Sequence, residues 1–192
     1  MMAQVAVLGL FQAGPAAAQA LLEGAELELF LALRPDAEGA VDPSAALALV
    51  LRGVDLGIRD AAQATPLHRA AEATRDPELI RAMVARGADP AARDGLGRTP
   101  LHAAAAANPS APVAGALAAA GAPLDARDGE GRTALHLAAA PEVAALLLLA
   151  GADACLTDGL GRPALSAETL ASIAEAQPGP AYAAARAAFL RC

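Results

Sequence analysis

The sequence predicts an all-α protein, a solenoid of stacked helix-turn-helix units joined by short β-hairpin-like turns. Two observations support this prediction. First, 56% of the 192 residues are hydrophobic but only 2% are aromatic, and a core made mainly of alanine and leucine favours closely packed helices over sheets. Second, three short phrases recur along the chain in a fixed order, which is typical of a repeat architecture.

The first phrase marks the start of a helix in each unit. It reads TPLHRAA from Thr65, TPLHAAA from Thr99 and TALHLAA from Thr133, so its period is 34 residues. A degenerate fourth copy, PALS, follows at 163. A threonine hydroxyl can accept the unpaired N–H groups of a first helical turn, and proline is tolerated there because its missing N–H is not needed. We therefore expect the first helix of a unit to begin after each copy.

The other two phrases mark turns. One reads RGVD, RGAD, AGAP and AGAD from residues 52, 86, 120 and 150, and its glycine ends a leucine- or alanine-rich helical stretch. The other reads DGLGR, DGEGR and DGLGR from residues 94, 128 and 158, and aspartate followed by glycine is typical of turns. One unit is therefore a turn, a helix, a loop, a second helix and a turn.

The flanks extend this pattern and give the domain organisation. Helical patterns at 26–33 and 44–51 form a degenerate first unit, and those at 167–176 and 181–190 close the stack. The unit from Thr133 lacks four residues between Ala139 and Val143, so we expect a very tight loop between its helices. The prediction is a signal peptide at 1–20 and a single domain at 21–192, with units at 21–64, 65–98, 99–132, 133–162 and 163–192.

Over residues 44–162 these phrases resemble the ankyrin repeat. The resemblance implies a curved ankyrin-repeat solenoid that holds other proteins. It also implies a ladder of hydrogen bonds between units made by the three histidines. Zinc binding is the alternative, but metal ligands must converge on one point, whereas equivalent positions of a stack lie one repeat apart. We therefore interpret six residues as a structural motif: Thr65, His68, Thr99, His102, Thr133 and His136.

The resemblance places partner binding at the hairpin tips and the exposed side of each first helix. Carried over residue by residue, the candidate positions are Leu96, Arg98, Glu130, Arg132, Leu160, Arg162 and Glu72. The three arginines can engage carboxylates of a partner through forked hydrogen bonds. The alternative is that they pair with the aspartates of their own turns, Asp94, Asp128 and Asp158.

The composition and missing motifs limit the function classes. The chain has a net charge of −7 and scattered arginines without a basic cluster, which argues against nucleic-acid binding. Residues 99–124 are uncharged but contain four prolines, so we expect no membrane span. We find no H-E-x-x-H, G-x-S-x-G or phosphate-loop motif. We expect a monomeric, non-enzymatic protein-protein interaction module without cofactor or metal. The alternative is a structural or protective accessory of the immunity type, dedicated to one exported client.

The ends of the chain bear on its compartment. Residues 1–20 contain no charge, an apolar run at 5–11 and the motif Ala18-Gln19-Ala20, which resemble a secretory signal cleaved before Leu21. We therefore expect a periplasmic or secreted protein in which Cys155 and Cys192 can form a disulfide. In the alternative, this segment is a capping helix of a cytoplasmic protein and both thiols stay reduced.

Overall fold

A computed structural model describes residues 24–35, 41, 43–176 and 179–190. Across these residues the chain forms ten α-helices and no strand, and one isolated antiparallel bridge joins Thr157 to Pro163. The predicted all-α class is therefore confirmed. The predicted signal peptide lies outside the described residues.

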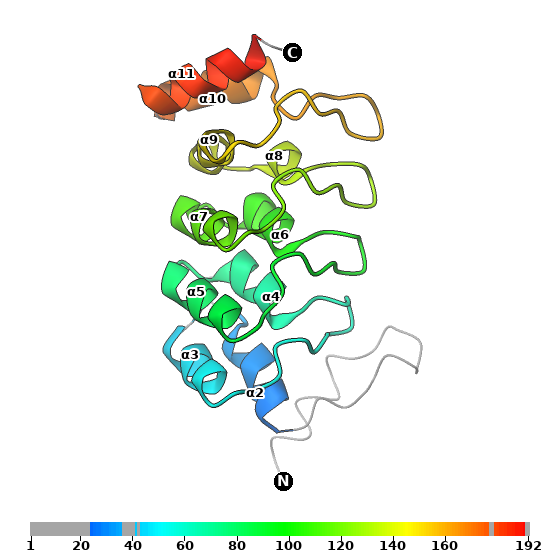
Figure 1. Ribbon diagram of the computed structural model, residues 1–192, viewed down its shortest axis with the longest axis vertical. Helices are drawn as coiled ribbons and strands as arrows, with labels where there is room; N and C mark the ends of the chain where they lie inside the picture. Colours follow the sequence, from blue (N-terminus) through cyan, green and yellow to red (C-terminus); the bar gives the residue numbers. More distant parts are fainter. Residues whose placement is uncertain (1–23, 36–40, 42, 177–178, 191–192) are drawn as a thin grey trace.

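The helices form five consecutive pairs. In chain order they are α2 (Ala25–Ala32) and α3 (Pro43–Leu51), α4 (Pro66–Ala73) and α5 (Pro77–Ala85), α6 (Pro100–Ala107) and α7 (Ala111–Ala119), α8 (Ala134–Leu137) and α9 (Pro141–Ala150), and α10 (Ala167–Ala176) and α11 (Pro180–Phe189). First helices α2, α4, α6 and α8 stack in one row, second helices α3, α5, α7 and α9 stack in another, and the hairpins project to one side (Figure 1).

The core lies between the two rows of helices. Leu67, Leu101 and Leu135, the leucines of the recurring phrase, are buried at equivalent positions in three successive units. Leu79 and Ile80 of α5 are fully buried on the facing row. Because each unit buries its apolar face against its neighbours, the core runs along the whole stack.

The short unit differs from the expectation. Helix α8 has four residues where α4 and α6 have eight, whereas three residues join the two helices in each of these units. The loss therefore shortens the helix, and the prediction of a tighter loop was wrong. The backbone N–H of Ala139 donates to the Ala105 carbonyl (3.0 Å), as the Asn108 side chain donates to the Ala71 carbonyl (2.9 Å) one unit earlier.

The last unit also departs from the pattern. Its first helix begins at Ala167, three residues later than the degenerate copy would place it, because Pro163 stands where threonine caps the other units. Ser166 caps this helix instead, and its hydroxyl accepts the N–H of Thr169 (3.1 Å). Helices α10 and α11 both pack against α9, so α10 does not continue the row of first helices above α8 (Figure 1).

None of the helices in the described part of the chain combines the length and the hydropathy that a membrane crossing requires.

Candidate partner-binding surface

Each histidine of the recurring phrase closes a capping box at the start of its helix. In the first such unit, Nδ1 of His68 accepts the backbone N–H of Thr65 (3.2 Å) and lies 2.8 Å from its hydroxyl, which donates to the same nitrogen. His102 and His136 repeat these contacts with Thr99 and Thr133. Histidine thus takes the place that glutamate or glutamine usually holds in a capping box.

The other ring nitrogen of each histidine links its unit to the next. Nε2 of His68 donates to the Arg98 carbonyl (3.0 Å), and His102 and His136 reach the carbonyls of Arg132 (3.0 Å) and Arg162 (3.1 Å). The ladder therefore consists of hydrogen bonds from the histidine ring of one unit to the backbone of the next unit. Because Nδ1 accepts while Nε2 donates, each ring is neutral in this arrangement.

Burial reinforces the neutral form. Burial lowers the pKa of His68 below its ordinary value and outweighs the hydrogen bond to the Arg98 carbonyl. Burial likewise lowers the pKa of His102, although the hydrogen bond to the Arg132 carbonyl acts to raise it. Among the described residues, no three histidine, cysteine or carboxylate side chains gather into a group that could hold a metal ion.

The arginines at the hairpin tips are held by the aspartates of their own turns. The guanidinium of Arg98 donates through Nε (2.9 Å) and Nη2 (2.8 Å) to Oδ2 of Asp94, and Asp94 Oδ1 accepts the N–H groups of Leu96 and Arg98 (2.9 Å each). The same contacts recur between Arg132 and Asp128 and between Arg162 and Asp158. This is the second of the two arrangements that the sequence left open.

These contacts stabilise the charged carboxylates. Burial by itself would raise the pKa of the Asp94 carboxyl, but the hydrogen bonds from Arg98 and Leu96 outweigh it and keep the pKa below its usual range. The Asp128 carboxyl is lowered in the same way. For Asp158, the bonds from Arg162 and Leu160 overcome burial and lower the pKa to about 2.

Backbone contacts tie neighbouring hairpins together. Gly95, Gly129 and Gly159 each donate an N–H to a carbonyl of the preceding hairpin, those of Ala62, Leu96 and Glu130 (2.9 Å each). A Cβ at Gly159 would lie 2.8 Å from the carbonyl oxygen, closer than real Cβ atoms approach, and a Cβ at Gly95 or Gly129 would lie 3.0 Å from it, so that the neighbouring hairpin would have to shift. The first glycine of each DGxGR phrase is therefore required by the close approach of two hairpins.

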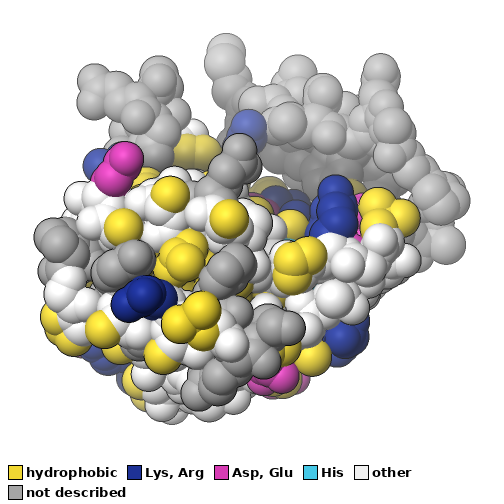
Figure 2. Space-filling view, turned by 90° about the horizontal axis from the view of Figure 1, so that it is seen from above, with side chains coloured by type: hydrophobic (Ala, Val, Ile, Leu, Met, Phe, Trp, Pro, Cys, Tyr) yellow, Lys and Arg dark blue, Asp and Glu magenta, His cyan; other side chains and the backbone are white. Residues whose placement is uncertain are grey.

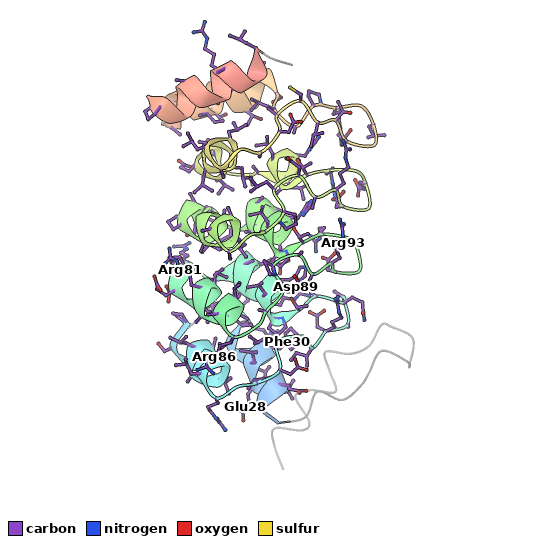
Figure 3. The ribbon with its side chains drawn as sticks, viewed as in Figure 1. Glu28, Phe30, Arg81, Arg86, Asp89 and Arg93 are labelled. Atoms are coloured by element: carbon purple, nitrogen blue, oxygen red, sulfur yellow. The ribbon has the colours of Figure 1, made fainter. Side chains whose placement is uncertain are left out.

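A second set of arginines, which the sequence analysis treated as scattered, forms a further ladder. Nη1 of Arg93 donates to the Gly97 carbonyl of its own hairpin and to the Arg127 carbonyl of the next (2.7 Å each). Arg59 and Arg127 make the equivalent pairs of contacts. Arg93 lies on the hairpin side of the stack, and Arg81 lies on the opposite side at α5 (Figure 3). The recurrence of arginine at 59, 93 and 127 was the signal that could have revealed this ladder.

The candidate partner-binding residues differ in how open they are. Leu96 and Leu160 are 62% and 79% exposed, and Glu130 between them is also exposed. The side chains of Arg98, Arg132 and Arg162 are 24%, 26% and 63% exposed. Glu72 is half-buried and paired with Arg69 (2.9 Å), whose guanidinium also holds Asp60. Leu96, Glu130, Leu160 and Arg162, which we call the tip row, are the open members of the predicted set.

A shallow hollow of about 410 Å³ lies within this surface. Leu96 and Gly97 line it from one hairpin, and Asp128, Glu130 and Arg132 line it from the next. The predicted Cys155–Cys192 bridge cannot be placed on this surface, because Cys192 lies outside the described residues.

The comparisons with known proteins agree with this geometry. The family model described as ankyrin repeats in three copies matches residues 29–128 and, in an overlapping match, residues 67–158. No curated protein matches the sequence. Ankyrin repeats are generally protein-protein interaction modules and are typically non-enzymatic. Since the matches together cover more than half of the chain, and the capped helix pairs and linked hairpins follow the same period, the chain belongs to the ankyrin repeat family.

Proposed function

We propose that the chain is a non-enzymatic interaction module that holds one protein partner on its tip row. The observation that carries this proposal is the pair of leucines exposed at equivalent tips, Leu96 and Leu160, on hairpins that are both hydrogen-bonded to the hairpin between them. A surface that is already rigid loses little conformational entropy when a partner binds. Two apolar side chains presented in this way are therefore suited to contact apolar groups of a partner.

The charges of the tip row indicate what else the partner carries. Glu130 is paired with Arg132 (3.1 Å) and Arg162 with Asp158 (2.7 Å), but their side chains are 68% and 63% exposed, so that a basic side chain of a partner can also approach Glu130 and an acidic one Arg162. The row offers no aromatic residue, and aromatic residues dominate strong binding hot spots. We therefore propose a partner bound through several modest contacts rather than one deep anchor.

Charge reversal of the tip arginines is a poor test of this proposal. From the sequence alone, changing Arg98, Arg132 and Arg162 to glutamate is expected to leave the helices intact. In the structure each guanidinium is the partner of an almost fully buried aspartate. Reversal would place two carboxylates side by side and leave one of them buried without a counter-charge, which is strongly destabilising.

The leucines provide a cleaner test. We propose to compare the protein with the double variant Leu96→Ser/Leu160→Ser by cross-linking and mass spectrometry in extract of the native host. Leu149→Ser is the matched control, because Leu149 is also 56% exposed but lies on α9, in the row of second helices. Circular dichroism should be unchanged in both variants, since none of the three side chains is buried.

The proposed function requires that the double variant loses a protein which the parent and Leu149→Ser both retain. Retention of the same protein by the double variant would contradict the tip row as the binding surface. Capture of a single client, in an amount equal to that of the protein itself, would favour the dedicated accessory role over a general adaptor.

A further inference from the structure

The end of α8 and the loop after it are more exposed than the same positions one unit earlier. Ala103, Ala104 and Ala105 of α6 are each 1% exposed because α8 and the loop after it cover them. The equivalent residues of the next unit are Leu137, Ala138 and Ala139, of which the first two are half-buried and the third is exposed. His136 is likewise only half-buried, whereas His102 is fully buried.

The cause of this greater exposure is the displacement of the last unit. Helix α10 begins late and packs with α11 against α9, so no first helix follows α8 in its row (Figure 1). Figure 2 shows the molecule from this end, where hydrophobic side chains outnumber charged ones on the described part of the surface nearest the viewer. Among the described residues, the row of first helices therefore ends at α8, where Leu137 and Ala138 are half-buried and Ala139 is exposed.

We propose that this position, the α8 notch formed by Leu137, Ala138, Ala139 and Arg162, binds a short amphipathic helix of the protein partner with an acidic residue in its first turn. The inference rests on the proposed function, because it names the chemistry of the partner. It adds a second contact surface, at the end of the row of first helices and adjoining the tip row at Arg162.

The interface continues one that the molecule already contains. Helix α6 packs on α4, and α8 packs on α6, each through small or aliphatic side chains. A partner helix placed over α8 would take the position that α6 takes on α4, but it would lie on the single turn of α8 and the loop after it, because α8 has four residues where α4 has eight. The small residues of α6 that make this contact, alanines above all, predict a partner helix whose inner face carries alanine or leucine at helical spacing.

The charge at the notch specifies one end of that helix. The Arg162 carbonyl accepts Nε2–H of His136 (3.1 Å), which places Arg162 beside the first turn of α8. Its side chain is more than twice as exposed as those of Arg98 and Arg132, because no hairpin follows it. A helix running in the same direction as α8 would begin near this guanidinium. An acidic residue in its first turn would interact favourably with Arg162 and with the helix dipole.

The test uses a defined probe and the full chain. The probe is a capped, hydrocarbon-stapled peptide with the α6 sequence TPLHAAAAA in which glutamate replaces the proline of the first turn, titrated into ¹⁵N-labelled protein. A peptide with lysine in place of that glutamate is the charge control. The variant is Ala139→Arg, and the control is Ala106→Arg, because both alanines are exposed, although Ala106 lies in the last turn of α6 and Ala139 in the loop after α8.

We expect chemical-shift changes at Leu137, Ala139 and Arg162. Ala139→Arg should weaken binding about tenfold or more through bulk and lost contact, Ala106→Arg should leave it within about twofold, and the lysine peptide should bind several-fold more weakly at low salt. Shift changes confined to Leu96 and Leu160, or equal binding by both variants, would overturn the proposal.

Two other occupants are distinguished by the same variants. Self-association that is seen by sedimentation and lost in Ala139→Arg would assign the notch to a second copy and overturn the proposal. Nuclear Overhauser contacts between residues 1–23 and Ala139 in the free protein would assign it to this chain and do the same. If Leu96→Ser/Leu160→Ser loses the cellular partner while Ala139→Arg keeps it, the proposed function stands and the α8 notch does not.

Discussion

The imidazole of His102 connects one unit to the next through hydrogen bonds on both of its ring nitrogens. Its ring receives the backbone N–H and hydroxyl of Thr99 and donates to the Arg132 carbonyl, all within a fully buried site. Protonation of Nδ1 would remove the acceptor that both Thr99 groups use. The same reasoning applies to His68. The stability of the stack should therefore depend on these rings remaining neutral.

This dependence predicts that the protein loses stability in acid at pH values well above those at which its carboxylates titrate. The unfolded chain takes up protons near the ordinary histidine pKa of 6.5, whereas burial lowers the pKa of His68 and His102 in the folded protein. Unfolding therefore binds protons, and the free energy of unfolding should fall as the pH drops below 6.5 until the folded-state pKa is reached. The lowered aspartate pKa values act separately, below their ordinary value of 3.8. Urea titrations between about pH 7 and pH 5 measure the effect.

The variant His102→Ala separates this cause from others. It should lower the free energy of unfolding at neutral pH by about 1 to 3 kcal/mol, because the Thr99 N–H and the Arg132 carbonyl lose their partner. It should also reduce the loss of stability between about pH 7 and pH 5, because one of the two buried titrating rings is gone. A variant that unfolds like the parent but no longer binds the partner would show that His102 is a binding residue instead.

At the scale of the hairpins, the glycines test how closely neighbouring turns approach. Gly131 and Gly161 hold the same place in successive turns with the same φ of +76°, which disfavours any other residue. A Cβ at Gly131 would lie 2.9 Å from the Gly159 nitrogen, whereas one at Gly161 would meet no atom within 4 Å. Gly161→Ala should cost about 1 kcal/mol from backbone strain alone. Gly131→Ala should cost more, and equal midpoints in urea would contradict a tight hairpin contact.

The helix starts were predictable because their signals are local. Threonine followed by proline marked α4 and α6, and the pattern at 167–176 matched α10. The half-length of α8 was not predictable, because counting missing residues does not show whether a helix or a loop loses them. The hydrogen bond from Ala139 to the Ala105 carbonyl, which depends on the neighbouring unit, decided that outcome.

The tip surface was predictable only in part for a similar reason. The positions of Leu96 and Leu160 followed from the resemblance to the ankyrin repeat. The pairing of Arg98 with Asp94 was one of two alternatives, because which charge an arginine meets depends on the turn geometry. The role of Arg93 was missed, since its two carbonyl partners belong to backbone that only the folded stack brings together.

At the scale of the whole molecule, we propose that the protein is exported and that its two cysteines are joined. Protein purified from its native host should then have the intact mass of a chain that begins at Leu21, and a non-reducing peptide map should contain Cys155 linked to Cys192. Such a bridge would close a long loop and restrict the unfolded chain. An uncleaved N-terminus together with two thiols that can be alkylated would contradict both parts and favour a cytoplasmic protein.

The stack should also be uneven in its resistance to opening, and hydrogen exchange can measure this. Helix α6 lies between two neighbours and buries six residues, whereas the described side chains of α10 and α11 that are fully buried are Ile173 and Ala185. Both closing helices dock on α9. In a linear stack, an end unit with few buried contacts can open without unfolding its neighbours. Amides of α10 and α11 should therefore exchange faster than those of α6 and α7 in reduced protein, where the predicted bridge cannot contribute. Equal protection in both regions would mean that the stack opens as a single cooperative unit.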